Sequence, residues 1–269
     1  MILPDIDRVT ALIREVAAAE ILPRFRSLGD GDIREKGPGD LVTVADEAAE
    51  RVLTARLPDL LPGSLVIGEE AVSADPSVME RLSDDRPVWI VDPVDGTINF
   101  ANGRDRFGTI VALARGGRTI AGWIVHPVQG RAFTAVAGEG TWADGERIRI
   151  PAPPTRPEEM RGLLSVYSHT PESRERMEAS RARFALTDTF LASAFDYPAI
   201  LTGERHFVNY RRTLPWDHAA GILMVTEAGG AAARPDRAPY TLTGTTEGIL
   251  VVAGADIWET VRETLFGDG

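Results

Sequence analysis

A short apolar stretch that runs directly into two aspartates is the feature that most restricts how this chain can fold. Residues 88–91 read VWIV, with no polar residue among them, and therefore predict a strand buried on both faces. The chain continues without a linker into DPVDGT, residues 92–97. Because an isolated buried charge is costly, this predicts that the strand ends at a cleft. A plain turn is the alternative interpretation, since Asp, Pro and Gly are common turn residues.

Other acidic residues also lie at the edges of apolar elements. Glu69 and Glu70 end SLVIGEE, a predicted strand over 64–70, Asp217 stands before an apolar helix pattern, and Asp46 lies near the start of another predicted helix. Strand ends and helix starts often present side chains to a shared cleft. Taken one at a time, Asp217 could be a helix cap and the glutamates a solvated strand end. Together, these carboxylates would need a cation in order to stay ionised.

The residue types indicate which cation and which chemistry. The chain contains no cysteine, so thiolate metal sites, disulfides and cysteine nucleophiles are excluded. Oxygen-only ligands favour hard cations such as Mg²⁺. If a helix begins at Thr97, its free N–H groups form an anion site, and Gly96 lets the backbone approach a ligand closely. Two metal ions about 4 Å apart can activate a water and stabilise a leaving oxygen, the layout for hydrolysis of a phosphate ester.

Charge and hydropathy exclude several classes of protein. The net charge of −11 over 269 residues repels phosphate polymers, so we expect no binding to nucleic acid or to an anionic membrane, and a nuclease is disfavoured. The sequence contains no apolar run near the ~20 residues of a membrane helix, and its first residues lack the basic start of an export signal. We expect a cytoplasmic protein.

The hydrophobic pattern predicts two lobes. Residues 1–150 predict an N-terminal α+β lobe that carries the acidic motifs, and residues 151–269 an α/β lobe that carries Asp217, with the proline-rich segment 151–160 at the junction. Within them, the sequence predicts helices over 5–28, 43–57, 171–184, 216–230 and 255–266, a glycine-rich loop over 29–40, an antiparallel meander over 107–150 and a strand over 161–168.

Four motifs in their order identify a known family. They are DLVTVADEAAE (40–50), IGEE (67–70), WIVDPVDGTINF (89–100) and PWDHAAGILMVTEAGG (215–230). With them the chain resembles the inositol monophosphatase family of Mg²⁺-dependent, Li⁺-sensitive sugar phosphatases over nearly its whole length. The resemblance implies a layered α+β or α/β fold, an α-β-α-β-α sandwich, and a homodimer.

The resemblance also implies a role for each motif residue. Glu69, Asp92 and the Val94 carbonyl match the ligands of a first metal ion. Asp92, Asp95 and Asp217 match those of a second, with two or three Mg²⁺ ions in all. Glu69 and Thr97 would position and deprotonate the attacking water, with Asp46 as the hydrogen-bond partner of Thr97. The residues implied in substrate or phosphate binding are Asp95, Gly96, Thr97, Asp217, Tyr210 and Arg211.

Departures from the family pattern concern the substrate. Ile98 replaces a second threonine, Leu191 stands at a glycine position, and Tyr210 replaces a glutamate that contacts the inositol ring. Arg211 and Arg212, which follow, suit a second phosphate, although surface or dimer-interface charges are the alternative. The predicted substrate is a small phosphorylated polyol or sugar such as inositol 1-phosphate. Fructose 1,6-bisphosphate, histidinol phosphate and an adenosine bisphosphate remain alternatives.

Lys36 resembles a basic residue of the family's mobile active-site loop, and a solvated loop charge is the alternative. The histidines at 126, 169, 206 and 218 have no metal-ligand spacing, so we expect structural roles for them. A non-catalytic regulatory or binding protein is the competing hypothesis, and it is disfavoured because none of the implied metal ligands is missing.

Overall fold

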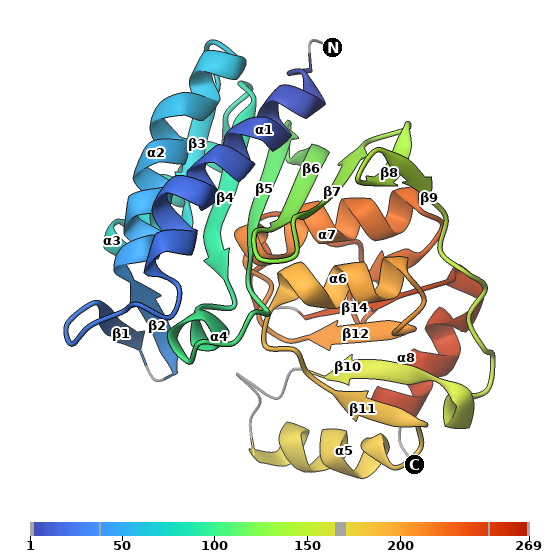
Figure 1. Ribbon diagram of the computed structural model, residues 1–269. Helices are drawn as coiled ribbons and strands as arrows, with labels where there is room; N and C mark the ends of the chain where they lie inside the picture. The colour runs from blue at the N-terminus through green and yellow to red at the C-terminus, as the bar shows by residue number, and fades with distance from the viewer. Residues whose placement is uncertain (1–2, 38, 165–170, 247, 268–269) are drawn as a thin grey trace.

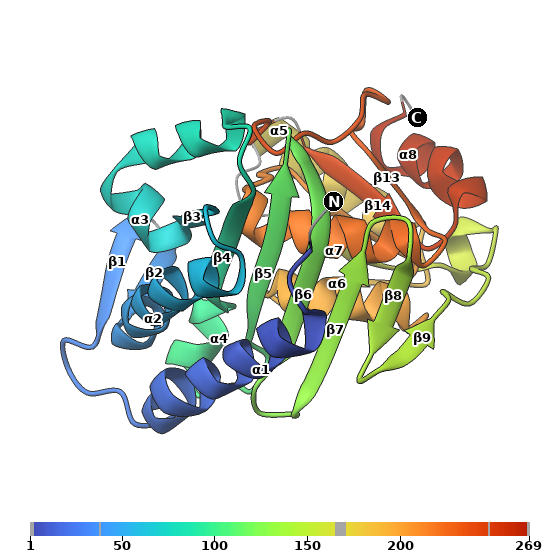
Figure 2. The same cartoon turned by 90° about the horizontal axis from the view of Figure 1, so that it is seen from above.

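The computed structural model describes residues 3–37, 39–164, 171–246 and 248–267. Helices and two large sheets alternate in five layers (Figure 1). The predicted α-β-α-β-α sandwich is therefore confirmed. Figure 2, seen from above, shows the first pair of helices lying across the larger sheet on the side opposite the central helices.

The first helical layer consists of α1 (Ile6–Val16) and α2 (Val44–Leu60). The predicted helix over 5–28 begins as expected, with Asp5 as its N-cap, but its α-helical part ends at Val16. The chain continues through a π-helical turn, η1 (Ala17–Ile21), and a 3-10 turn, η2 (Leu22–Arg24). The Leu22 N–H bonds to the Ala17 carbonyl oxygen, and Pro23, which follows, has no N–H with which a regular α-helix could continue.

The larger sheet has seven strands in chain order, so the predicted meander is confirmed. Strands β3 and β4 are parallel, and every later neighbouring pair is antiparallel. The strands are β3 (Leu65–Gly68), β4 (Val88–Asp95), β5 (Gly108–Arg115), β6 (Arg118–His126), β7 (Arg131–Val136), β8 (Gly140–Ala143) and β9 (Glu146–Ile148).

The other layers come from the second half of the chain. The central helices are α6 (Ser193–Leu201) and α7 (Pro215–Glu227). The five-stranded sheet has the order β11-β10-β12-β14-β13. Its strands are β10 (Arg161–Leu164), β11 (Leu186–Asp188), β12 (Phe207–Tyr210), β13 (Ala231–Ala233) and β14 (Ile249–Val252). The last layer is α5 (Pro171–Arg181) and α8 (Trp258–Phe266), which a 3-10 turn, η5 (Ala255–Ile257), precedes. The end of the predicted strand over 161–168 lies outside the described residues.

Two predicted elements were wrong in part. Residues 33–37 of the predicted loop form β1 (Ile33–Gly37), which pairs antiparallel with β2 (Asp40–Thr43). Most of the side chains of β1 are exposed, so no apolar pattern marked the strand. The predicted strand over 64–70 ends at Gly68, and the two glutamates begin α3 (Glu69–Ala74) instead. Acidic residues are stabilised in a first helical turn, where the backbone N–H groups are free.

Three apolar clusters fill the spaces between the layers. One packs α1 and α2 on the larger sheet, the second surrounds α6 and α7 between the sheets, and the third packs α5 and α8 on the smaller sheet. The second cluster contains residues from both sides of the predicted boundary at 150. Each large sheet nevertheless lies on one side of that boundary, and we retain the two lobes, 1–150 and 151–269, as a proposal.

Candidate active site

The two aspartates of the opening motif belong to the end of β4, where all eight residues are buried. In a regular strand, residues three apart point to opposite faces. Here Asp92 pairs with Ile110 and Asp95 with Gly108, so three steps along β4 match two steps along β5. This bulge adds one residue and turns Asp95 back toward the side of Asp92. Pro93, which could not donate to a regular ladder, lies inside the bulge.

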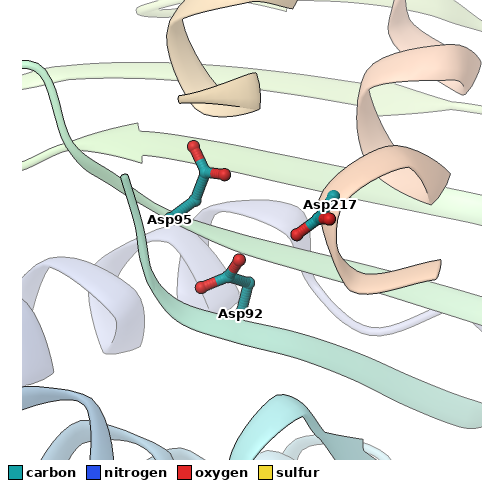
Figure 3. A group of neighbouring side chains, drawn as sticks. All are labelled: Asp92, Asp95 and Asp217. Carbon is teal, nitrogen blue, oxygen red and sulfur yellow. The ribbon is translucent and has the colours of Figure 1, made fainter. Parts of the chain in front are cut away.

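Asp217 completes a cluster of three carboxylates. It is the third residue of α7, and not an N-cap, because the helix begins at Pro215. One carboxylate oxygen from each of Asp92, Asp95 and Asp217 lies within 4.8 Å of the other two. Figure 3 shows the three side chains directed toward one another from β4 and from the start of α7.

The three carboxylates cannot all be ionised at the same time without a large cost in free energy. Burial, followed by the charges of Glu69 and Asp95, raises the pKa of Asp92 well above its usual range. The pKa of Asp217 is raised well above its usual range in the same way, first by burial, although the charge of Arg212 opposes this. Burial also raises the pKa of Asp95 to about 6, against hydrogen bonds from Ala194 and Ser193. A bound cation would remove this conflict.

Asp46 and Thr97 form a second part of the site. The Thr97 Oγ1 lies 3.2 Å from Asp46 Oδ1 and 3.0 Å from the Val94 carbonyl oxygen, so its hydroxyl can donate to either. Asp46 is held by α2 itself, because its Oδ2 accepts from the Thr43 N–H at 2.8 Å in a capping box. Burial raises the pKa of Asp46 to about 7. The hydrogen bond between Thr97 and Asp46 is the one expected from the sequence.

Gly96 makes the turn from β4 into α4 (Thr97–Ala101). Its φ of 86° is in the left-handed region, and a Cβ there would lie 2.9 Å from both the Ala192 Cβ and the Arg106 carbonyl oxygen. Only glycine fits this position without a shift of the neighbouring chain. The helix begins at Thr97 as predicted, but it has five residues, so its dipole is small and its free N–H groups are the main feature offered to an anion.

Glu69 lies beside the cluster and is paired with a lysine. Lys36, on β1, places its Nζ 2.6 Å from Glu69 Oε1 and 3.0 Å from Glu70 Oε1. Its side chain is 15% exposed, so the alternative of a freely solvated loop charge does not describe it. Burial, with the added charge of Glu69, raises the pKa of Glu70 to about 7.

Glu50 is a residue of this site that the sequence analysis missed. Its buried carboxylate accepts from the backbone N–H groups of Glu70 and Ala71, both at 2.8 Å, and so caps the start of α3. Gly68 leaves the necessary room, because a Cβ there would lie 2.2 Å from the Glu50 carboxyl carbon. Glu50 is inside one of the quoted motifs, but nothing local in DEAAE shows that its partners lie about twenty residues ahead.

Asp95 has partners on α6 that the sequence analysis also missed. Its Oδ1 accepts from the Ser193 hydroxyl at 2.8 Å, and its Oδ2 accepts from the Ala194 N–H at 2.7 Å. These two hydrogen bonds fix the orientation of the carboxylate and join the two halves of the chain at the site. Ser193 therefore orients an aspartate.

Of the residues expected to contact the substrate's alcohol group, only some line the pocket. Tyr210 donates its hydroxyl to Asp196 Oδ2, and burial raises the pKa of Asp196 to about 7. Arg212 lines the pocket and lies 3.4 Å from Asp40. Arg211 is exposed and is not among the described residues that line the pocket. His218 has a structural environment: its Nε2 lies 3.1 Å from the Arg212 carbonyl oxygen and its Nδ1 lies 3.0 Å from the Tyr197 hydroxyl.

These groups surround a pocket of about 290 Å³. Of the residues proposed from the sequence, Asp46 and Val94 are hydrogen-bond partners of Thr97, and seven line the pocket: Glu69, Asp92, Asp95, Gly96, Thr97, Tyr210 and Asp217. A pocket of this size suits one small metabolite. Within the described residues, no helix is long and apolar enough to cross a membrane.

Comparison with known proteins identifies the family. The model of the inositol monophosphatase family matches residues 5–264. The chain belongs to this family. Inositol monophosphatase 2 of Solanum lycopersicum is 30% identical over an alignment of 219 residues, and the alignment covers 78% of this chain and 81% of that protein. The fructose-1,6-bisphosphatase/inositol-1-monophosphatase of Thermotoga maritima is 30% identical over 197 residues, 73% of this chain and 72% of that protein.

Solved structures agree with this assignment. An inositol monophosphatase from Thermotoga maritima has a TM-score of 0.80 and 26% identity and covers 97% of both chains. The extragenic suppressor protein suhB of Bartonella henselae has a TM-score of 0.82 and 24% identity, covering 96% of this chain and 98% of that one, and supports the fold. The predictions of the family, of the fold class and of a phosphoric monoester hydrolase are confirmed.

Proposed function

We propose that this inositol monophosphatase family member is a Mg²⁺-dependent phosphomonoesterase that hydrolyses a small phosphorylated polyol or sugar. The observation that carries the proposal is the cluster of Asp92, Asp95 and Asp217, whose oxygens lie within 4.8 Å of one another. Two of them are buried, and the two nearby cations already form ion pairs: Lys36 with Glu69 at the edge of the site, and Arg212 with Asp40. An all-oxygen set with excess negative charge fits a hard divalent cation.

Each residue then has a proposed role. Glu69, Asp92, Asp95, Asp217 and the Val94 carbonyl would hold two or three Mg²⁺ ions, which would supply positive charge to the phosphate and lower the pKa of a water. The Thr97 hydroxyl, oriented by Asp46, and the Glu69 carboxylate would position the water, and the Glu69 carboxylate would accept its proton. The N–H groups of Gly96 and Thr97 would bind phosphate oxygens. The ester P–O bond would break on the side opposite the attacking water, and the leaving alkoxide would take a proton from solvent water to become the alcohol.

The remaining contacts concern the leaving alcohol. Tyr210 and Arg212 line the pocket and are our candidates for contact with it, whereas Arg211 would need to move to reach it. Inositol 1-phosphate is the first substrate to test, and fructose 1,6-bisphosphate, histidinol phosphate and an adenosine bisphosphate follow. From the family resemblance we extend the proposal to a cytoplasmic, Li⁺-sensitive homodimer without a nucleic-acid partner. Inhibition of turnover by LiCl and sedimentation of the purified protein test the Li⁺ sensitivity and the dimer.

Phosphate release from this substrate panel, with Mg²⁺ and with a chelator, tests the proposal. We expect turnover only with Mg²⁺, and a loss of at least about a thousandfold in kcat/KM for Asp92→Asn, because ligand removal takes away much of the transition-state stabilisation. Asp59→Asn, at an exposed position on α2, is the matched control and should behave as wild type. A folded protein without turnover on any substrate would favour the non-catalytic alternative.

A further inference from the structure

Leu191 has an unusual backbone conformation beside the proposed phosphate site. Its φ is 59°, in the left-handed region that glycine adopts readily and a leucine rarely does. Its partly exposed side chain belongs to the lining of the pocket. A residue held in such a conformation indicates that the surrounding structure maintains it, often at a functional site.

Contacts on both sides of Leu191 hold this conformation in place. Two guanidinium groups contact the ring of Phe190, with Arg106 Cζ 4.5 Å and Arg205 Cζ 4.9 Å from its centroid. The Phe190 carbonyl oxygen accepts from Asn99 Nδ2 at 2.9 Å. On the other side, Ser193 donates to Asp95 as described above. Leu191 therefore lies between two anchored segments and has little freedom to relax.

Two more apolar side chains lie around the same pocket. Leu41 on β2 and Ile98 on α4 are partly exposed and line it together with Leu191. Ile98 is next to Asn99, whose side chain bonds Phe190, so Ile98 and Leu191 lie on segments joined by a hydrogen bond. Within the described residues, none of the three is part of the apolar clusters between the layers or packed against them. Their apolar surface is thus available to a ligand.

We propose that Leu191, with Ile98 and Leu41, selects phosphomonoesters whose alcohol presents an apolar face, such as carbon–hydrogen groups or an aromatic ring, beside the ester. A ring hydroxyl directed at these side chains would lose its water without gaining a hydrogen bond, whereas an apolar face would gain by burial. The inference rests on the proposed phosphomonoesterase activity and refines its substrate class, because Asp196 and Tyr210 of the same pocket can still bind polar groups of the alcohol.

Two substrates with the same ring test the proposal. Cyclohexyl phosphate and inositol 1-phosphate differ in the ring hydroxyls, and the kcat/KM ratio of the two is measured for wild type, Leu191→Ala, Leu191→Gly and Ile98→Thr. Comparing variants with wild type cancels the different reactivity of the two leaving groups. We expect the ratio to shift about tenfold toward inositol 1-phosphate in each variant, the size typical of lost apolar contacts in a specificity pocket. Leu186→Ala, an exposed leucine on β11, should leave the ratio unchanged.

Thermal unfolding of the same variants tests the strained backbone. Leu191→Gly relieves the left-handed conformation and Leu191→Ala retains it, so Leu191→Gly should have the higher Tm although both lose the side chain. A lower Tm for Leu191→Gly would contradict this account.

The outcomes separate the two proposals. Turnover that continues with ratios within twofold of wild type in all three variants would overturn the selectivity and leave the activity intact. If wild type releases no phosphate from either substrate or from the wider panel with Mg²⁺, the proposed activity fails and the selectivity fails with it.

Discussion

Two features of Gly96 favour glycine: its left-handed backbone and the lack of room for a side chain. Gly63 is a control that separates the two effects. Gly63 has a φ of 84°, against 86° for Gly96. A methyl group on Gly63 would meet no heavy atom within 4 Å, whereas one on Gly96 would meet two at 2.9 Å. Gly63→Ala should therefore lower the free energy of unfolding by ~1 kcal/mol, the cost of the left-handed backbone alone.

Gly96→Ala should lower the free energy of unfolding by that amount and by a further ~1–3 kcal/mol, because the methyl group overlaps Ala192 and Arg106. It should also reduce phosphate release by displacing Thr97. Urea denaturation of both variants provides the comparison. Equal losses would show that the neighbouring chain yields easily and that the close contact has no cost.

At the scale of elements, Glu50 connects α2 to the start of α3. In Glu50→Gln, an NH₂ group replaces one carboxylate oxygen and would face one of the two N–H groups that now donate to Glu50. We expect a loss of ~1–3 kcal/mol in the free energy of unfolding and weaker Mg²⁺ binding, because Glu69 is in the turn that Glu50 caps. Isothermal titration with Mg²⁺ measures the second effect. Glu47→Gln, an exposed change on the same helix, should leave Mg²⁺ affinity near that of wild type.

His126 connects β6 to α6 and predicts a dependence of stability on pH. Its Nε2–H donates to the Ala194 carbonyl oxygen at 2.7 Å, its ring stacks on Phe195, and burial lowers its pKa to about 4. Between pH 6.5 and pH 4, His126 binds a proton in the unfolded chain but stays neutral in the folded chain. The free energy of unfolding therefore falls as the pH falls from 6.5 to 4, by up to about 3 kcal/mol.

Urea denaturation across this range, for wild type and His126→Gln, isolates the effect, since titrations common to both proteins cancel. The variant should be less stable at pH 7 and should lose less stability on acidification. The same slope in both proteins would show that His126 does not contribute to it.

The elements that the sequence predicted well are those with a strong internal pattern. The meander over 107–150 consists of apolar runs separated by turn residues, and the helix at Asp217 contains one long apolar run, and both were confirmed. The prediction for residues 33–37 was wrong because most side chains of β1 are exposed and form no apolar pattern, although its partner β2 is next to it in the chain. The prediction for Glu69 and Glu70 was wrong because a distant residue, Glu50, caps the start of α3. Local sequence carries little information about contacts of this kind.

At the scale of the whole molecule, the crowded carboxylates of the acidic cluster should destabilise the metal-free protein, and they also form the proposed metal site. The proposed Mg²⁺ ions would bind the folded chain and not the unfolded one. The Tm should therefore rise with Mg²⁺ concentration, and the free energy of unfolding should increase by about 2.7 kcal/mol at 100 times the Kd. Asp92→Asn removes one of the crowded carboxylates, so without metal it should melt at or above the Tm of wild type and should respond little to Mg²⁺. Differential scanning fluorimetry with Mg²⁺ and with a chelator tests this. A wild-type Tm that is independent of Mg²⁺ would argue against a metal site at the cluster.

The amino-acid sequence by itself determined the carboxylates that we propose as ligands, the absence of sulfur ligands, the strongly patterned helices and strands, and, through its motifs, the family. Only the tertiary structure decided that the bulge in β4 turns Asp95 toward Asp92, that Lys36 pairs with Glu69, and that Leu191 adopts a left-handed conformation beside the pocket. The physical reason is the range of the interactions. Spacing along the chain governs hydrogen bonds within a helix or strand, whereas packing between layers selects which distant groups meet and which local conformations are held against their cost.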